Sequence, residues 1–524
     1  MASKEFGDFQ TPLPLVRQIV ELLGPVGQKW TRVLEPTCGR GNFIRGLLES
    51  PSPPDEIIGV EIQQAAAAEA SSLALLASAK NCRLRVLNDS AFGISFAADL
   101  RWQTQGPLLV LGNPPWVTNA ELGSLGSSNL PRKSNIKGLR GILALTGHSN
   151  FDIAESIWIK LLSQLRCINA HVALLCKTSV ARNVLTHTRK VGLPVSGAAL
   201  RMIDARRWFG ASVGACLFSL DLNAGPTDYE ADVFDDLMAR SPSRKLGFAR
   251  EALVADIENY RRVSFVEGAS PLEWRQGIKH DAAALMELTF DGFEYHNASG
   301  EVLDIEADYI FPLLKSSSLA SGRQVRPQLA VIVPQKALNE DSTPLRHIAP
   351  RLWRYLHEHA DVFRARKSSI YKGRPLFSIF GIGDYSFAAY KVAVSGLHKR
   401  PRFVPVGPCC GKPTMLDDTC YFVPCDSAGQ AATLAGVLNH PITASFIAST
   451  TFNDAKRPIT KALLSRIDVL AVARQLPWRE LADSASQQWD RFVGDAVKDR
   501  PEWPADFSAI LDPTAGDRPR TLFA

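Results

Sequence analysis

The stretch "VLEPTCGRGNFIRGLL" (Val33 to Leu48) joins an apolar run, an acidic residue, a glycine-containing turn and an amphipathic segment. This order predicts a β-strand, a tight turn and an α-helix. Gly39 and Gly41 would let the turn pass close to a ligand, and Glu35 could accept hydrogen bonds from a cationic or hydroxylated group. A phosphate would be repelled by that carboxylate. An ordinary structural turn would also explain the glycines.

The same alternation of short apolar runs and amphipathic segments continues from Thr31 to about Leu222. The expected strands are "RVLEP", "EIIGVEI", "CRLRVLN", "LLVLGN", "AHVALLC" and "ACLFSLDL", and the expected helices are 14–23, 43–49, 64–78 and 154–165. Strands that alternate with helices predict an α/β fold, a Rossmann-like, mostly parallel sheet with helices on both faces. Such sheets bind ligands outside the carboxyl ends of their strands.

Acidic residues end the next two expected strands. Glu61 follows Gly41 by about twenty residues, where an acid can bind the two hydroxyls of a ribose. Asp89 ends the following strand and could accept from an exocyclic amine. Together with Glu35 they predict a cofactor that carries a nucleoside but no phosphate. S-adenosylmethionine fits better than NAD or ATP, because neither G-x-G-x-x-G nor G-K-[ST] is present.

The stretch "PLLVLGNPPWVTN" (Pro107 to Asn119) places Asn113, Pro114, Pro115 and Trp116 directly after an apolar run. Proline has a fixed φ and no backbone N–H, so this turn is expected to be a rigid acceptor site. The ring of Trp116 offers a flat surface for stacking. A long loop, 117–150, follows, for which substrate gating and plain disorder are both open.

Several motifs, in a fixed order, carry a family resemblance. They are "FQTPLPLVRQIVELL", "VLEPTCGRGNF", "GVEI", "LND", "GNPPW" and "RWFGASVGACLFSL". As a set they resemble the serial motifs of the gamma-class N6-adenine DNA methyltransferases, densely over about 6–222 and more loosely beyond. The resemblance implies a class I S-adenosylmethionine-dependent catalytic domain followed by a target-recognition domain.

The resemblance also implies roles for single residues. The cofactor-binding positions that it implies are Thr11, Pro12, Glu35, Gly39, Gly41, Glu61 and Asp89. The catalytic positions are Asn113, Pro114, Pro115 and Trp116, with Phe209 packing against an extruded base. Two departures stand out. Ser90 occupies a position that is often aromatic in relatives, so Phe92 or Ile94 is expected to cover the cofactor's adenine, and Trp116 replaces the commoner tyrosine or phenylalanine.

The tetrapeptide suggests a chemistry for an adenine amine, which is a poor nucleophile because its lone pair is delocalised. If its two N–H groups donate to the Asn113 side-chain oxygen and the Pro114 carbonyl, the lone pair can face a sulfonium methyl. Catalysis would then be mostly positioning. Trp116 would stack on the base, a contact worth ~1–3 kcal/mol, and the base would have to be flipped out of the duplex.

The second half of the chain holds a basic block. From Arg323 to Lys412 there are about sixteen Lys or Arg and about five Asp or Glu. Such a block is typical of a surface that binds a polyanion, although a solvated charged surface would look the same. The expected contacts to double-stranded DNA are Arg364, Arg366, Lys367, Lys372 and Arg374, interleaved with Tyr371 and Phe377. Lys279, His280 and Asp281 are expected to lie in a loop that orders this domain rather than to act in catalysis.

These patterns predict three parts: a catalytic domain at 1–225, a connector at 226–269 and a mixed α+β target-recognition domain at 270–524. No secretory h-region and no run of ~18 apolar residues is present, so a cytoplasmic protein without membrane contact is expected. The nine cysteines lack a C-x-x-C pattern, so reduced thiols and no metal are expected. No nuclease block precedes the motifs, so restriction should come from a separate endonuclease or defence-system subunit.

The sequence thus predicts a site-specific DNA adenine-N6 methyltransferase of a restriction-modification or phage-defence system. Two alternatives stay open. One is a catalytically silent DNA-binding specificity subunit with the same fold, and the other is an RNA adenine methyltransferase. The tetrapeptide also occurs in enzymes that modify DNA cytosine or a protein glutamine, but the latter would need no basic domain.

Overall fold

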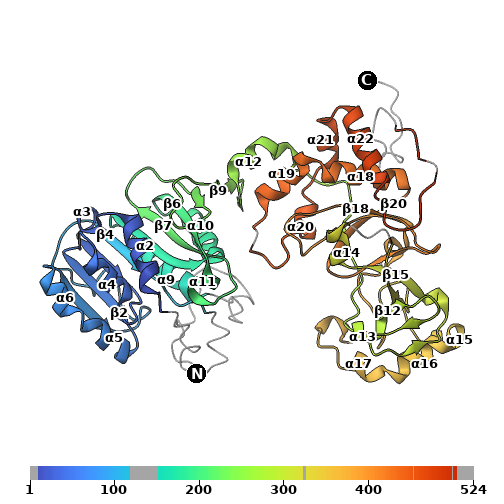
Figure 1. Cartoon of the computed structure of the whole chain (residues 1–524), viewed down its shortest axis with the longest axis horizontal. Coiled ribbons are helices and arrows are strands. Elements are labelled where there is room, and N and C mark those ends of the chain that lie inside the picture. The colour runs from blue at the N-terminus through green and yellow to red at the C-terminus, as the bar shows by residue number, and fades with distance from the viewer. Residues whose placement is uncertain are drawn as a thin grey trace. The chain divides into compact units, whose positions relative to one another are not determined.

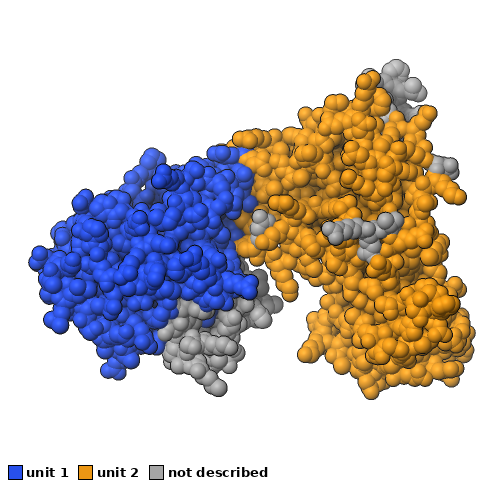
Figure 2. Space-filling view, viewed as in Figure 1, with its two compact units in different colours: residues 1–258 blue, residues 259–524 orange. Residues whose placement is uncertain are grey.

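The computed structural model describes residues 10–117, 152–322, 326–452, 454–498, 500–503 and 511. The chain forms two compact units, 1–258 and 259–524 (Figure 2). Apart from Val117, the loop expected at 117–150 lies outside the described residues.

Unit 1 is built on a ten-stranded sheet of order β10-β9-β8-β6-β7-β5-β4-β1-β2-β3 (Figure 1). Its strands are β1 (Arg32–Glu35), β2 (Glu56–Glu61), β3 (Arg83–Asn88), β4 (Leu108–Gly112), β5 (Ala170–Lys177), β6 (Val195–Ile203), β7 (Ala215–Leu222), β8 (Ala231–Phe234), β9 (Arg244–Ala249) and β10 (Ala252–Val254). The five strands from β1 to β5 pair in parallel, whereas β7 runs antiparallel between β5 and β6. The predicted α/β fold is confirmed.

The helices of unit 1 connect and cover these strands. They are α2 (Leu13–Leu23), α3 (Val26–Lys29), α4 (Asn42–Glu49), α5 (Gln64–Ser71), α6 (Ala74–Ala79), α9 (Ile153–Gln164), α10 (Thr178–Val191) and α11 (Ala205–Phe209). One core cluster joins the buried side of α2 and α4 to alternate residues of the strands, such as Leu109 and Leu111 of β4. The helix expected at 64–78 breaks between α5 and α6, and β6, whose sequence mixes small and polar residues, was not expected.

The segment expected as a connector, 226–269, is divided between the units: residues 226–258 belong to unit 1 and the rest to unit 2. Its strands β8, β9 and β10 extend the sheet beyond β6, with β8 parallel to β6 and β9 antiparallel to β8. The boundary between the units falls after Glu258, inside α12 (Ile257–Val263).

Unit 2 contains two smaller sheets. The four-stranded sheet has the order β11-β20-β17-β18, and the six-stranded sheet β14-β13-β12-β16-β15-β19. Their strands are β11 (Arg275–Gln276), β12 (Glu287–Phe290), β13 (Tyr295–His296), β14 (Val302–Leu303), β15 (Ile310–Leu314), β16 (Leu329–Ile332), β17 (Tyr390–Ser395), β18 (Val404–Val406), β19 (Met415–Leu416) and β20 (Cys420–Cys425). Most neighbouring strands pair antiparallel, so unit 2 is a mixed α+β unit.

Helices flank both sheets of unit 2. They are α13 (Ala283–Met286), α14 (Ser316–Ser321), α15 (Leu345–Ile348), α16 (Pro350–Glu358), α17 (Ala360–Arg364), α18 (Ala428–Asn439), α19 (Pro441–Thr450), α20 (Lys461–Leu464), α21 (Val469–Arg474) and α22 (Trp478–Trp489), with short 3₁₀ turns at 264–266, 307–309, 369–371 and 384–387. Among the described residues, no single helix is long and apolar enough to cross a membrane. Within the described ranges, only the bent pair of α18 and α19 reaches that length and composition.

Candidate active site

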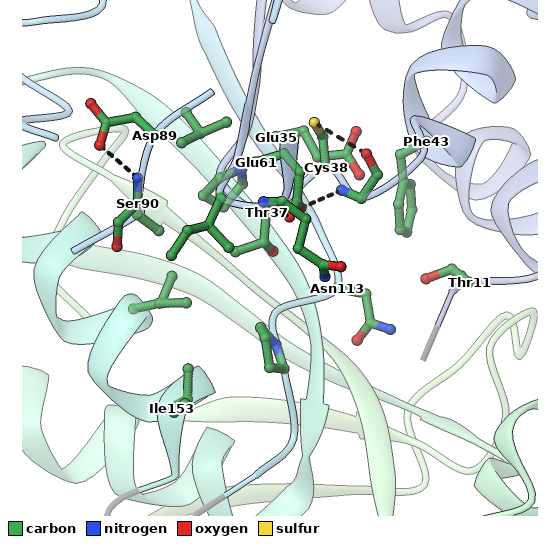
Figure 3. Close-up of a pocket in the computed structure, with 18 of the residues that line it drawn as sticks. Thr11, Glu35, Thr37, Cys38, Phe43, Glu61, Asp89, Ser90, Asn113 and Ile153 are labelled. Carbon is green, nitrogen blue, oxygen red and sulfur yellow. Dashed lines mark hydrogen bonds between the residues drawn. The ribbon is translucent and has the colours of Figure 1, made fainter. Parts of the chain in front are cut away.

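A pocket opens at the carboxyl ends of β1, β2, β3 and β4, and encloses about 800 Å³ of space including its open mouth. Seven of the residues predicted from the sequence line it: Thr11, Glu35, Gly39, Glu61, Asp89, Asn113 and Pro115. In Figure 3, Asp89 and Thr11 lie on opposite sides of the view, with Glu35 and Glu61 between them. The fold of unit 1 therefore brings together residues as far apart in the chain as Thr11 and Pro115.

Two other predicted cofactor residues, Pro12 and Gly41, do not line the pocket but directly adjoin lining residues in the chain, Thr11 and Asn42. The carbonyl of Pro12 accepts hydrogen bonds from the amides of Leu15 and Val16 at the start of α2. Gly41 precedes α4 with a φ of +84°, and a Cβ there would lie 3.0 Å from Leu73. Gly41 is thus required by the turn itself and by packing against the segment after α5.

Gly39 lines the pocket in a left-handed backbone conformation that favours glycine. Its φ is +52°, and a Cβ would lie 2.8 Å from the side-chain nitrogen of Gln10. Its backbone N–H donates to one carboxylate oxygen of Glu61 at 2.9 Å, and the N–H of Gln63 donates to the other at 2.8 Å. The Glu61 carboxylate is therefore oriented by the backbone of its own pocket.

The carboxylate of Glu35 is in the opposite situation. Its side chain is 2% exposed, and its Oε2 has no hydrogen-bond partner in the described part of the chain. Burial, together with the nearby charge of Glu61, raises the pKa of Glu35 well above its ordinary value. The buried hydroxyl of Thr37 likewise lacks a partner among the described residues. The pocket thus contains acceptor groups that a cationic or hydroxylated ligand would satisfy.

Several lining residues were not predicted from the sequence, namely Gln10, Pro36, Thr37, Cys38, Asn42, Phe43, Val60, Ile62, Gln63, Ala91, Ile153 and Ile157. The positions of Ile62 and Gln63, directly after the strand-end acid, could have indicated them. Phe92, one of the two residues expected to cover the adenine, lines the pocket, whereas Ile94 does not.

The Asn-Pro-Pro-Trp turn follows β4 and reaches the pocket with Asn113 and Pro115. Trp116 turns away into the core: it is 5% exposed, and its Nε1 donates to the Leu175 carbonyl at 3.4 Å. Its ring meets that of Phe209 edge to face, with centroids 5.0 Å apart. The turn and the predicted base-packing residue are therefore neighbours, although the faces of Trp116 are largely covered.

In unit 2, two of the five predicted DNA-contact residues use their side chains inside the fold. Arg366 donates to the carbonyls of Phe363, His280, Ser378 and Leu376, and its guanidinium lies 3.6 Å from the centroid of Tyr371. Arg374 donates to the carbonyl of Ile370 and to the side chain of Asn339.

The other three predicted contacts, Arg364, Lys367 and Lys372, are exposed. Arg364 forms an ion pair with Asp361 of its own helix at 2.7 Å. Exposed cations of this kind are available to a polyanion. A surface ion pair contributes little to stability, so a phosphate can take the place of the Asp361 carboxylate at small cost.

The side chains of Lys279, His280 and Asp281 contact other groups of unit 2. Lys279 pairs with Asp281 at 3.0 Å, while His280 is 6% exposed and lies 3.6 Å from Glu287. Burial lowers the pKa of His280. Among the described residues no group of three metal-ligating side chains occurs.

Comparison with known proteins finds a relative of almost the same length. The chain is 36% identical over 478 residues to the type II methyltransferase M.NspV of Nostoc sp., an alignment that covers 90% of this chain and 97% of the relative. No family model matches. The structure of the type IIL restriction-modification enzyme MmeI in complex with DNA aligns with 96% of this chain and 70% of its own, at a TM-score of 0.52.

At 12% identity, the likeness to MmeI shows the fold alone. The relative from Nostoc sp. shows more, because it is similar over almost its whole length. With 36% identity across nine tenths of its residues, this chain belongs to the type II methyltransferases of restriction-modification systems, and its cofactor is S-adenosyl-L-methionine.

Proposed function

We propose that this chain is a site-specific DNA adenine-N6 methyltransferase that protects host DNA as the modification component of a restriction-modification system. The observation that carries the proposal is that the Asn-Pro-Pro-Trp turn and the three strand-end carboxylates line the same pocket. Asn113 and Pro115 of the rigid turn open onto the space lined by Glu35, Glu61 and Asp89. An acceptor site for an amine thus faces a site suited to a nucleoside cofactor.

The residues of the pocket fit S-adenosylmethionine. The buried carboxylate of Glu35, with one oxygen unpartnered among the described residues, suits the α-ammonium group of its methionine part, and Thr11 lines the same pocket. The oriented carboxylate of Glu61 suits the ribose hydroxyls. Asp89, which lies across the view from Thr11 in Figure 3, suits the adenine amine. When bound, the cofactor supplies an electrophilic methyl group on a sulfonium.

Asn113 and Pro114 would prepare the acceptor. The two N–H groups of an adenine amine donate to the Asn113 side-chain oxygen and to the Pro114 carbonyl, which draws the nitrogen towards tetrahedral geometry. Its lone pair would then face the sulfonium methyl. Direct displacement would form the N–C bond as the S–C bond breaks, leave a neutral thioether and release one amine proton to solvent, so it needs no covalent enzyme intermediate. A neutral amide suits this role because it accepts hydrogen bonds without adding a buried negative charge beside Glu35 and Glu61.

The target adenine must leave the duplex, at a cost of a few kcal/mol. Trp116 and Phe209 form an edge-to-face pair next to the turn. In our proposal the extruded base stacks against this pair, which requires the side chain of Trp116 or its neighbours to move, since the ring is 5% exposed. Stacking of a base on an aromatic ring contributes ~1–3 kcal/mol.

Unit 2 would select the DNA sequence. The proposal assigns the target-recognition domain to 270–524 and phosphate contacts to the exposed side chains of Arg364, Lys367 and Lys372. Arg366 and Arg374 would hold the loop that carries these cations, because their donors already bind groups within the fold. MmeI, which has the same fold, binds DNA in its own structure, and this supports DNA as the substrate here.

The test is methylation-aware sequencing of DNA from a methylation-free host that expresses the protein or its Asn113→Ala variant. We expect N6-methyladenine in one short sequence motif, absent with the variant. Methylated cytosine in place of adenine would overturn the assigned base. Unmodified DNA together with methylated RNA would favour an RNA methyltransferase. Unmodified DNA and RNA, with soluble protein that binds the cofactor, would favour a catalytically silent specificity subunit.

A further inference from the structure

One face of α9 contacts both the pocket and the loop after β3. Ile153, Ile157, Lys160 and Gln164 are spaced by four, three and four residues, so they lie on one side of the helix. Ile153 and Ile157 line the pocket. The two polar residues further along this face hold the loop that contains Ser90, Ala91 and Phe92.

The ammonium group of Lys160 is the centre of this contact. Its Nζ donates to three carbonyls of the loop, those of Ala91 at 2.8 Å, Phe92 at 2.9 Å and Ile94 at 2.5 Å. All three donor hydrogens of a lysine can thus be used on one short segment. Gln164 adds a fourth bond, because its side-chain oxygen accepts from the Phe96 amide at 2.8 Å.

The loop held in this way is part of the pocket wall. Asp89, Ser90, Ala91 and Phe92 line the cavity. Within the loop, the Asp89 carboxylate accepts from the Ser90 amide at 2.6 Å, and the Ser90 hydroxyl accepts from the Phe92 amide at 3.2 Å. Without a cation, the three carbonyls that converge on Lys160 would repel one another, and the loop would lose its present form.

We propose that Lys160 is a positioning residue that orders the adenine side of the cofactor site by clamping the loop from Asp89 to Phe96. The inference rests on the proposed placement of the cofactor, with its adenine near Asp89. Lys160 does not touch the ligand; it fixes the backbone that presents Asp89 and Phe92. The methionine side of the site, around Glu35, is held by other elements.

The test compares two ligands by isothermal titration calorimetry. S-adenosylhomocysteine contains both adenosine and the ammonium group, whereas 5′-methylthioadenosine contains only the adenosine part. For Lys160→Met we expect both dissociation constants to rise by a similar factor of about ten. For Glu35→Gln, only S-adenosylhomocysteine should bind more weakly. The exposed Lys190→Met on α10 is the matched control and should change neither constant.

A purely structural role gives a different result. If Lys160 merely supports folding, Lys160→Met lowers the binding stoichiometry and the melting temperature while the folded fraction keeps its affinity for both ligands. That outcome, or weakening of one ligand alone, would overturn the inference. Gln164→Leu removes one bond of the same clamp and should weaken both ligands equally but less, which keeps the test decisive if Lys160→Met does not fold. If Glu35→Gln and Asp89→Asn also leave binding unchanged, the placement of the cofactor itself is wrong.

Discussion

The two units use their charged side chains in different ways. In unit 1 the carboxylates of Glu35, Glu61 and Asp89 stand at strand ends and line one pocket. In unit 2 the guanidinium of Arg366, from the most basic stretch of the chain, binds four backbone carbonyls of its own domain. A charged residue can therefore line a cavity or hold the backbone of its own unit, and the groups packed around it determine which. The following predictions test that difference.

The largest expected effect is that of Asn113→Ala. Loss of the side-chain oxygen leaves the amine with one of its two proposed acceptors, so we expect the rate of methyl transfer at saturating cofactor to fall by about 100- to 1,000-fold or more. The dissociation constant for S-adenosylhomocysteine should change by less than about twofold, because the proposal places the cofactor and the acceptor in different parts of the pocket. Single-turnover transfer to DNA and calorimetric titration measure the two quantities. Loss of both together would contradict the separate roles assigned to Asn113 and Glu35.

The second prediction concerns Glu35→Gln. A buried carboxylate with an unsatisfied oxygen should bind a cationic ligand strongly, so we expect the affinity for S-adenosylhomocysteine to fall by at least about tenfold. In the wild type this affinity should increase with pH, because the raised pKa of Glu35 leaves more of its carboxyl groups protonated at a given pH than an ordinary glutamate would have, and each proton lost restores the carboxylate that binds the cation. The variant should lack this pH dependence. An equal pH dependence in both proteins would show that another group titrates.

The same variant should have the opposite effect on stability. Because the folded protein holds a proton on Glu35 more tightly than the unfolded chain does, the contribution of Glu35 to stability is complete below the unfolded pKa, near 4.5, and is lost as pH rises. Without ligand, Glu35→Gln should therefore raise the free energy of unfolding near pH 7, by about 1–3 kcal/mol. Urea unfolding at pH 5 and pH 8 measures this. A variant that weakens both cofactor binding and stability would argue against a carboxylate kept for the ligand.

Strand ends made much of unit 1 predictable. Glu35, Glu61 and Asn113 each stand at the end of an apolar run. Because a parallel sheet binds its ligands at the carboxyl ends of its strands, this local pattern was enough to predict that these residues line the pocket. Ile153 and Ile157 carry no such signal, because α9 reaches the pocket only through tertiary packing. The burial of Trp116 could not be predicted either. The sequence shows an aromatic residue after the two prolines, but not that its ring packs against Phe209 and its Nε1 donates to the Leu175 carbonyl.

Unit 2 was less predictable for a related reason. Its strands are short and mostly antiparallel, and their neighbours come from distant segments, such as β11 beside β20. Basic residues in the loop after α17 looked alike in the sequence. Whether a side chain faces solvent, as Lys372 does, or the backbone, as Arg366 does, depends on contacts that no local pattern encodes.

The third prediction uses a buried cation of unit 2 that lies within a strand rather than at a strand end. Lys391 on β17 is 1% exposed, and burial lowers its pKa to about 7. Since the unfolded chain binds this proton up to about 10.5, the cost of the buried charge is complete below pH 7 and is relieved as pH rises towards 10.5. Lys391→Met should thus stabilise unit 2 by a few kcal/mol at pH 6 and by much less at pH 9.5.

Hydrogen–deuterium exchange can locate this effect. At pH 6, the peptide that contains β17 should exchange more slowly in Lys391→Met than in the wild type, whereas a peptide that contains β1 of unit 1 is the internal control. Faster exchange of β17 would mean that the bond from Lys391 to the Ala388 carbonyl outweighs the cost of the buried charge.

The smallest effect separates two cations of the same loop. Lys372 is exposed, so Lys372→Ala should leave the melting temperature unchanged and reduce the slope of log binding constant against log salt by about 1, through one lost phosphate contact. Arg366→Ala removes donors from the carbonyls of His280, Ser378 and Leu376, so it should lower the melting temperature and leave the salt slope of the remaining folded protein unchanged. Fluorescence anisotropy with a duplex, at several salt concentrations, measures the slope. If Arg366→Ala changed the slope and Lys372→Ala did not, Arg366 would be the residue that contacts a phosphate. The solvent exposure of a cation in unit 2 would then not predict whether it binds DNA.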